Sequence, residues 1–167
     1  MVAAEFRAWS DRRLTKDFQL SNSFQDLNTL KQLEVTNYHH RDQFMYGEDL
    51  KKGFIAQQVA EVFPEAVVQS KGFLPNIMAP STKIDLVNGA YQITLDQAHK
   101  LTLKDKVKIM VKDGELKLAI HDIIDDHTFS IKSDENKFDQ KVFVYGKEVD
   151  DLHSVCLLYT SPSPRDS

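Results

Sequence analysis

The chain has 167 residues, of which 41% are hydrophobic and 28% charged, so it is long enough for one medium domain or two small ones and is not typical of a disordered chain. The net charge of −4, with Lys interleaved among Asp and Glu, argues against a nucleic-acid partner. No apolar run approaches the roughly 20 residues that span a bilayer, so we expect no membrane partner. The single cysteine, Cys156, excludes a disulfide within the chain.

The first stretch of chemical interest is Trp9–Asp17, which contains a serine hydroxyl, carboxylates, guanidiniums and an amine. A solvated, salt-bridged turn has the same composition and is the first interpretation. The stretch lies so near the start of the chain that we expect the chain to be a fragment of a longer protein. No basic region followed by an apolar run precedes it, so we expect no signal peptide.

A helix is predicted over residues 23–34, because apolar side chains recur there at helical spacing. The four apolar residues are Phe24, Leu27, Leu30 and Leu33. The run Ser21–Ser23 favours a helix start, with Asp26 placed to accept a hydrogen bond from a free backbone N–H group.

A short strand is predicted over residues 35–38, and a polar loop follows it. The loop contains His39 and His40. Adjacent histidines point apart on a strand and are not neighbours on a helix face, so they make a poor chelate and we expect no metal there.

A second helix is predicted to begin near Gly53 and to end before Pro64, which pushes the preceding residue out of the helical region. An extended segment, residues 65–68, follows. Gln57 and Gln58 stand near the helix start, where the default expectation is capping and the alternative is hydrogen bonding across an interface.

Beyond Gly72 the helical spacing stops and short alternating runs predict an antiparallel β unit over about residues 80–132. Asn88-Gly89 and Asp113-Gly114 are strong turn signals, because Gly and Asn accept positive φ. The predicted strands are 83–87, 91–95, 107–111, 116–120 and 128–131.

The polar run between the last two of these strands contains two histidines and three aspartates. They are His121, Asp122, Asp125, Asp126 and His127. No zinc or EF-hand spacing fits them, so a polar hairpin tip is the expectation and we predict neither a metal nor a cofactor.

A buried strand is predicted over residues 142–152, after a polar connection. The final residues, 156–167, contain Ser-Pro repeats that hold neither a helix nor a central strand. We expect this tail to be non-native or disordered.

Two segments together resemble the peptidase S74 family, the C-terminal intramolecular chaperone domain of phage tailspike and tail-fibre proteins, also found in myelin regulatory factor. They are Ser10-Asp11-Arg12-Arg13-Leu14 and the block Gly53-Phe54-Ile55-Ala56-Gln57-Gln58-Val59 followed by Phe63-Pro64-Glu65-Ala66-Val67. Residues 142–151 are similar to the family's later segment. The resemblance covers about residues 9–155, with gaps, and the part from Phe73 onward looks like the β insertion of some tail-fibre members.

The resemblance implies a domain that assembles as a homotrimer, helps the upstream fibre segment of its own chain to fold, and is then released by self-cleavage between Trp9 and Ser10. Ser10 would be the nucleophile, with a lysine five positions later as its base. Thr15 stands at that position here, and the lysine follows at Lys16. The displaced base leaves two alternatives open: a one-time self-cleaving serine endopeptidase with a Ser10–Lys16 dyad, or a non-cleaving structural assembly module.

The architecture that we expect is α+β, a small helix and strand chaperone domain with an antiparallel β insertion. The chaperone domain is discontinuous, over residues 9–72 and 141–155, and the insertion covers residues 73–140. The resemblance also implies a C-terminal coiled-coil helix, which the proline-rich tail replaces. A phage origin would place the protein in the virion tail fibre, or in the host cytoplasm during assembly.

Overall fold

The computed structural model describes residues 12–14, 16–134, 138 and 141–155. The chain divides into two compact units. Unit 1 comprises Met1–Tyr38, Leu50–Gln69 and His153–Ser167, and unit 2 comprises His39–Asp49 and Ser70–Leu152.

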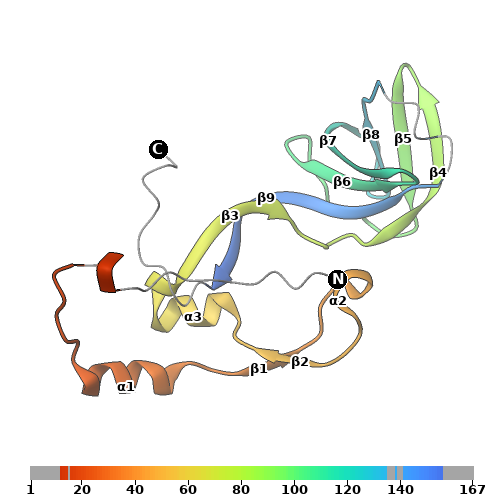
Figure 1. Ribbon diagram of the computed structural model, residues 1–167. Coiled ribbons are helices and arrows are strands. Elements are labelled where there is room, and N and C mark those ends of the chain that lie inside the picture. The colour runs from red at the N-terminus through yellow and green to blue at the C-terminus, as the bar shows by residue number, and fades with distance from the viewer. Residues whose placement is uncertain (1–11, 15, 135–137, 139–140, 156–167) are drawn as a thin grey trace. The chain divides into compact units, whose positions relative to one another are not determined.

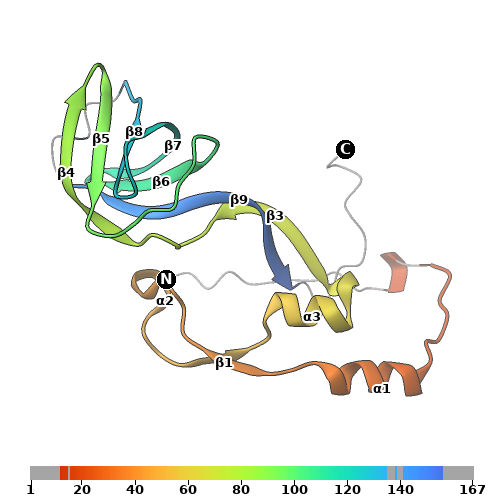
Figure 2. The ribbon, with the colours of Figure 1, turned by 180° about the vertical axis from the view of Figure 1, so that it is seen from behind.

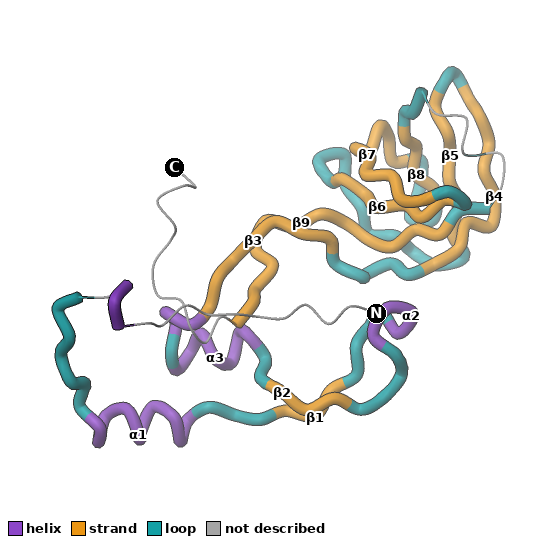
Figure 3. Tube along the Cα trace, in the orientation of Figure 1, coloured by secondary structure: helices purple, strands orange, loops and turns teal. Residues whose placement is uncertain are grey.

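The described helices and strands are shown in Figures 1 and 3 and confirm an α+β fold. In chain order they are η1 (Arg12–Leu14), α1 (Ser23–Gln32), β1 (Thr36–Tyr38), α2 (Gln43–Tyr46), β2 (Lys51–Gly53), α3 (Ala56–Val62), η2 (Pro64–Ala66), β3 (Val67–Phe73), β4 (Ala79–Val87), β5 (Ala90–Leu95), β6 (Lys106–Val111), β7 (Gly114–Ile123), β8 (Thr128–Ile131) and β9 (Phe143–Val155). None of the described helices is long and apolar enough to cross a membrane.

In unit 1, α1 begins at Ser23, as predicted. Asn22 is the N-cap, and its Oδ1 accepts hydrogen bonds from the backbone N–H groups of the next turn, at 3.1 Å and 3.3 Å. Asp26 therefore does not receive a backbone N–H group as expected; its Oδ1 accepts from the hydroxyl of Ser21 at 2.9 Å. The helix ends at Gln32 rather than at residue 34, because Leu33 has extended backbone angles.

The next part of unit 1 contains a strand, β2, that the sequence did not predict. Gly53 belongs to this strand rather than to the start of the second helix, which begins at Ala56. β1 pairs antiparallel with β2, with Thr36 opposite Gly53. α3 ends at Val62, and Pro64 starts the short 3₁₀ helix η2, so the expected helix stop is confirmed. Glu65 and Ala66 are thus 3₁₀ rather than extended as predicted, and the extended segment begins with β3.

Unit 2 is built on an antiparallel sheet whose strands follow the order β3-β9-β4-β5-β8-β7-β6. β9 also pairs with β6, which closes the strands from β4 to β8 into a barrel that both ribbon views show (Figures 1 and 2). Closure of this kind leaves few unpaired strand edges. A short helix that the sequence did not predict, α2, lies in the same unit.

The two predicted hairpin turns are present. Asn88 and Gly89 have φ angles of 51° and 76°, as a tight turn between β4 and β5 requires. Gly114 has φ of 142° where β7 begins. The barrel core is apolar, and its fully buried side chains include Ile93, Leu95, Val107, Ile109, Phe129, Ile131 and Val144.

Candidate functional site

The N-terminal motif is described from Arg12 onward, except for Thr15. Trp9, Ser10 and Asp11 lie outside the described residues, so the predicted cleavage site is not part of the described geometry. η1 carries Arg12, whose guanidinium lies over the ring of Phe18, 4.7 Å from its centroid.

Lys16, the predicted base, has a side chain that is 91% exposed. Its ammonium lies 3.9 Å from the carboxylate of Asp17, which has a positive φ of 57°. A lysine acts as a base only when it is neutral, and burial or neighbouring cations favour that form. The described surroundings of Lys16 supply a carboxylate and solvent instead.

The Gly53–Val59 block joins β2 to α3. Val59 is 2% exposed and anchors the helix. A Cβ at Gly53 would lie 3.5 Å from the hydroxyl oxygen of Tyr38 on the paired strand, an ordinary van der Waals contact, so the packing here does not require a glycine.

Gln58 links α3 to the residues around β1. The Oγ1 of Thr36 donates to the Oε1 of Gln58 at 3.1 Å, and the Nε2 of Gln58 donates to the Oε2 of Glu34 at 3.3 Å. The default expectation that this glutamine caps the helix was therefore wrong, because α3 has no side-chain cap. Gln58 instead links the motif block in α3 to Glu34 and to Thr36 of β1, and sequence spacing did not indicate these partners.

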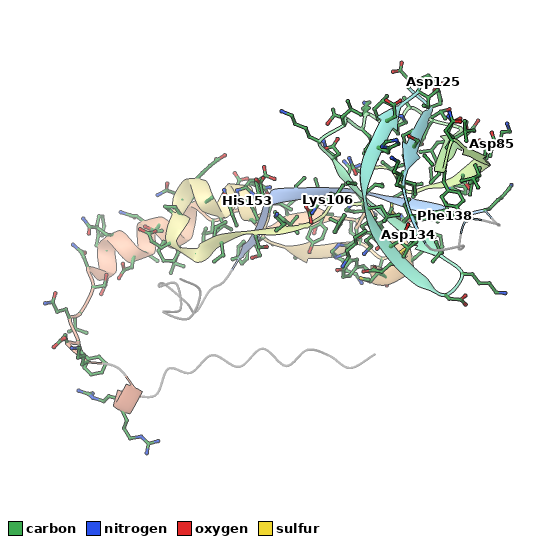
Figure 4. The ribbon with its side chains drawn as sticks, turned by 90° about the horizontal axis from the view of Figure 1, so that it is seen from above. Asp85, Lys106, Asp125, Asp134, Phe138 and His153 are labelled. Atoms are coloured by element: carbon green, nitrogen blue, oxygen red, sulfur yellow. The ribbon has the colours of Figure 1, made fainter. Side chains whose placement is uncertain are left out.

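The segment after Pro64 leads into β3, next to the end of β9. Ala66 is 1% exposed. The hydroxyl of Ser154 donates to the carbonyl of Val68 at 3.4 Å, and Gln69 lies 2.9 Å from the Nε2 of His153, which Figure 4 labels. Side-chain hydrogen bonds thus hold the C-terminal strand against the end of the Pro64–Val67 motif.

Unit 1 buries few apolar side chains and exposes many. Among the described residues of unit 1, the buried apolar ones are Val59 and Ala66. No residue of α1 is buried, and its predicted apolar face is exposed: 73% at Phe24, 50% at Leu27 and 63% at Leu30. We call these three residues the α1 face.

Further large apolar side chains of unit 1 are also exposed: Phe18, Leu20, Val35, Leu50, Phe54, Phe63 and Val68.

The polar run near β8 contains a turn closed by one aspartate. The Oδ1 of Asp125 accepts hydrogen bonds from the backbone N–H groups of His127 and Thr128, at 2.7 Å and 2.8 Å. The first of these bonds is the main cause that holds the pKa of Asp125 below its usual value. His121 and Asp122 belong to β7 rather than to the turn.

Within the described ranges, no group of three or more His, Cys, Asp or Glu is arranged to hold a metal ion. His39 and His40 follow β1 as expected, and His40 stacks on Tyr46 with ring centroids 4.2 Å apart.

A protein-family model matches part of this chain. Residues 10–68 match the Peptidase_S74 family model, described as chaperone of endosialidase, and this confirms the resemblance over that segment. Comparisons with curated proteins and with solved structures found no match.

Proposed function

We propose that this chain, which carries the Peptidase_S74 segment in residues 10–68, is an intramolecular chaperone that assembles as a homotrimer and aids the folding of an upstream fibre segment of its own chain. The family match supports the chaperone role in general terms. The trimer, the tail-fibre setting and the division into a chaperone domain (9–72 and 141–155) and a β insertion (73–140) are our proposal.

The observation that carries this proposal is the balance of buried and exposed apolar surface in unit 1. Burying one Leu or Phe side chain contributes roughly 1.5–3 kcal/mol. With only Val59 and Ala66 buried among its described apolar residues, unit 1 gains little from its own core. Packing of the α1 face against two further copies would supply the missing burial.

The α1 face also suits helix-to-helix packing between copies. Phe24, Leu27 and Leu30 are spaced by three residues and form one stripe along the helix. The other side chains of α1 are mostly polar, so association through this stripe would leave them in solvent.

Two equally exposed leucines test this proposal. Leu30 is 63% exposed on the α1 face, and Leu86 is 64% exposed on β4 of unit 2. In sedimentation velocity of the full chain, Leu30→Ser should shift the population from trimer towards monomer, and Leu86→Ser should leave it unchanged. If the two variants had the same proportions of trimer and monomer, an interface at α1 would be contradicted.

A second candidate function is self-cleavage between Trp9 and Ser10, and the motif residues carry it. The Oγ of Ser10 would attack the carbonyl carbon of Trp9, and the bond to the Ser10 nitrogen would break to give an ester and a free amine. Water would then hydrolyse the ester, which restores the hydroxyl and leaves a carboxylate on Trp9. Lys16 would take the hydroxyl proton during the attack and pass it to the departing Ser10 nitrogen. Its exposure and its neighbour Asp17 favour the non-cleaving alternative.

Intact mass separates these two functions. We would fuse a folded tag ahead of Met1 and compare the unsubstituted chain with Ser10→Ala and Thr15→Lys. Loss of the tag with a cut before Ser10, abolished by Ser10→Ala, would establish the endopeptidase. An uncut chain that Thr15→Lys makes competent would establish that the displaced base stops cleavage. If all three forms of the chain stay uncut, assembly is the candidate function that remains.

A further inference from the structure

Unit 2 contains a cavity that the chaperone role does not use. Its volume is about 500 Å³, within the range of small-molecule sites. All its lining residues belong to unit 2. Most of the wall is apolar, made of three methionines and three aromatic rings: Met45, Met78, Met110, Phe44, Phe143 and Tyr145. Methionine side chains are flexible and polarizable, so they adapt to ligands of different shape.

One carboxylate in this wall has no charged partner. Asp42 is 5% exposed, and its Oδ1 accepts a hydrogen bond from the backbone N–H of Met45 at 3.0 Å. In the described part of the chain it forms no ion pair. A buried charge is costly unless an opposite charge compensates it, so the cavity wall is suited to an added cation.

The Asp42 carboxylate affects the pKa of Tyr145, the tyrosine of the wall. Burial, followed by the negative charge of Asp42 and a hydrogen bond to it, raises the pKa of Tyr145 to about 12. The hydroxyl of Tyr145 thus stays protonated and adds no second negative charge to the wall.

The other two charged residues of the wall compensate each other. The ammonium of Lys108 lies 3.0 Å from the carboxylate of Glu115 and 4.3 Å from the ring centroid of Tyr145. This ion pair lowers the pKa of Glu115, chiefly through its hydrogen bond to Lys108. Glu115 also forms an ion pair with Lys117, at 3.1 Å, and Lys117 does not line the cavity. Among the lining residues, Asp42 is therefore the charged group that forms no ion pair in the described part of the chain.

The aromatic rings strengthen the preference for a cation. Phe44 meets Phe143 edge to face, with centroids 6.2 Å apart, and aromatic faces attract ammonium groups. Phe44 is 90% exposed, so the wall is open to solvent on the side of α2.

We infer that this cavity binds a small organic amine, with its ammonium group facing Asp42 and its apolar body packed against the methionines and phenylalanines. This inference is independent of the proposed chaperone function, because it rests on unit 2 alone.

The test uses two probes of nearly equal size that differ in charge, 2-phenylethylammonium and neutral 2-phenylethanol. The chain has four methionines, and three of them line the cavity. Spectra of the full chain labelled with ¹³C at the methionine methyl groups should show saturable shifts at Met45, Met78 and Met110 with the ammonium, while Met1 serves as the internal reference. The alcohol should bind at least about tenfold more weakly.

Asp42→Asn removes the charge and keeps a side-chain oxygen that caps α2 equally well. It should weaken ammonium binding about tenfold or more and leave alcohol binding unchanged. Asp96→Asn, at an exposed carboxylate of the same unit, is the matched control and should change neither. Equal binding of both probes, or ammonium binding that Asp42→Asn does not weaken, would overturn the inference, as would unshifted methyl signals.

Discussion

Substitution of Gly146 by alanine tests how tightly β9 packs in unit 2. A Cβ at Gly146 would collide with the backbone carbonyl of Leu74 and would lie 2.9 Å from the backbone nitrogen of Asn76. Backbone atoms cannot move aside as the end of a flexible side chain can. The segment around Leu74 would therefore have to shift away from β9.

That shift would disturb two hydrogen bonds across the same contact. The backbone N–H of Leu74 donates to the carbonyl of Lys147 at 3.0 Å, and the N–H of Lys147 donates to the Oδ1 of Asn76 at 3.0 Å. Overpacking costs about 1–3 kcal/mol, and each lost hydrogen bond about 1 kcal/mol. We expect Gly146→Ala to lower the free energy of unfolding by roughly 3–5 kcal/mol, a large part of a domain's total stability.

Gly114→Ala is the matched control. Gly114 also has a positive φ, 142° against 159° at Gly146, but no atom lies within 4 Å of its Cβ position. Gly114→Ala should lower the free energy of unfolding by only about 1 kcal/mol. Urea unfolding of both variants, followed by circular dichroism, measures the difference between them. If Gly146→Ala proves no more destabilising than Gly114→Ala, the contact between β9 and Leu74 is not as close as described.

Three further predictions concern side chains that accept hydrogen bonds from backbone N–H groups. Ser81→Ala should lower the free energy of unfolding by about 1–3 kcal/mol in urea titrations, because Ser81 is 1% exposed and its Oγ accepts from the buried N–H of Val142 at 3.0 Å; a neutral result would show that water replaces the hydroxyl. The lowered pKa of Asp125 in the folded state stabilises the protein above the usual Asp pKa of about 3.9, and this stabilisation is lost as the pH falls through the lowered folded value. Asp125→Asn should therefore lower the melting temperature at pH 7, and the melting temperatures of the two proteins should converge in acid. A difference in melting temperature that does not depend on pH would contradict a charge effect. Asn22→Ala should destabilise α1 by about 1 kcal/mol and speed amide hydrogen exchange in its first turn, whereas unchanged exchange would show that the cap does not hold the helix.

Local signals in the sequence predicted much of the fold. Asn88-Gly89 fixed the hairpin between β4 and β5, since both residues accept the positive φ that the turn requires. Pro64 ended α3, and the alternating run from Val107 to Val111 placed Val107 and Ile109 in the core.

Long-range pairing could not be predicted in the same way. β9 pairs with β3, β4 and β6, and no local spacing indicates which strands a long strand joins. For the same reason the Gln58 hydrogen bonds to Thr36 and Glu34 were missed. The burial of Asp42 was not predicted, because it depends on packing against residues far away in sequence.

The α1 face shows the opposite case. Its helical spacing was predicted correctly, but the same pattern indicates either a buried core or an interface, and the described side chains are exposed. We attribute that exposure to an association that a single chain does not contain.

The most direct test of the proposed assembly is sedimentation equilibrium of the full chain over a series of rising concentrations. The account predicts a concentration-dependent species of three times the 19.2 kDa chain mass, which Leu30→Ser shifts towards monomer and Leu86→Ser does not. A chain that stays monomeric at the highest concentration would contradict the proposal that its exposed apolar surface is a trimer interface.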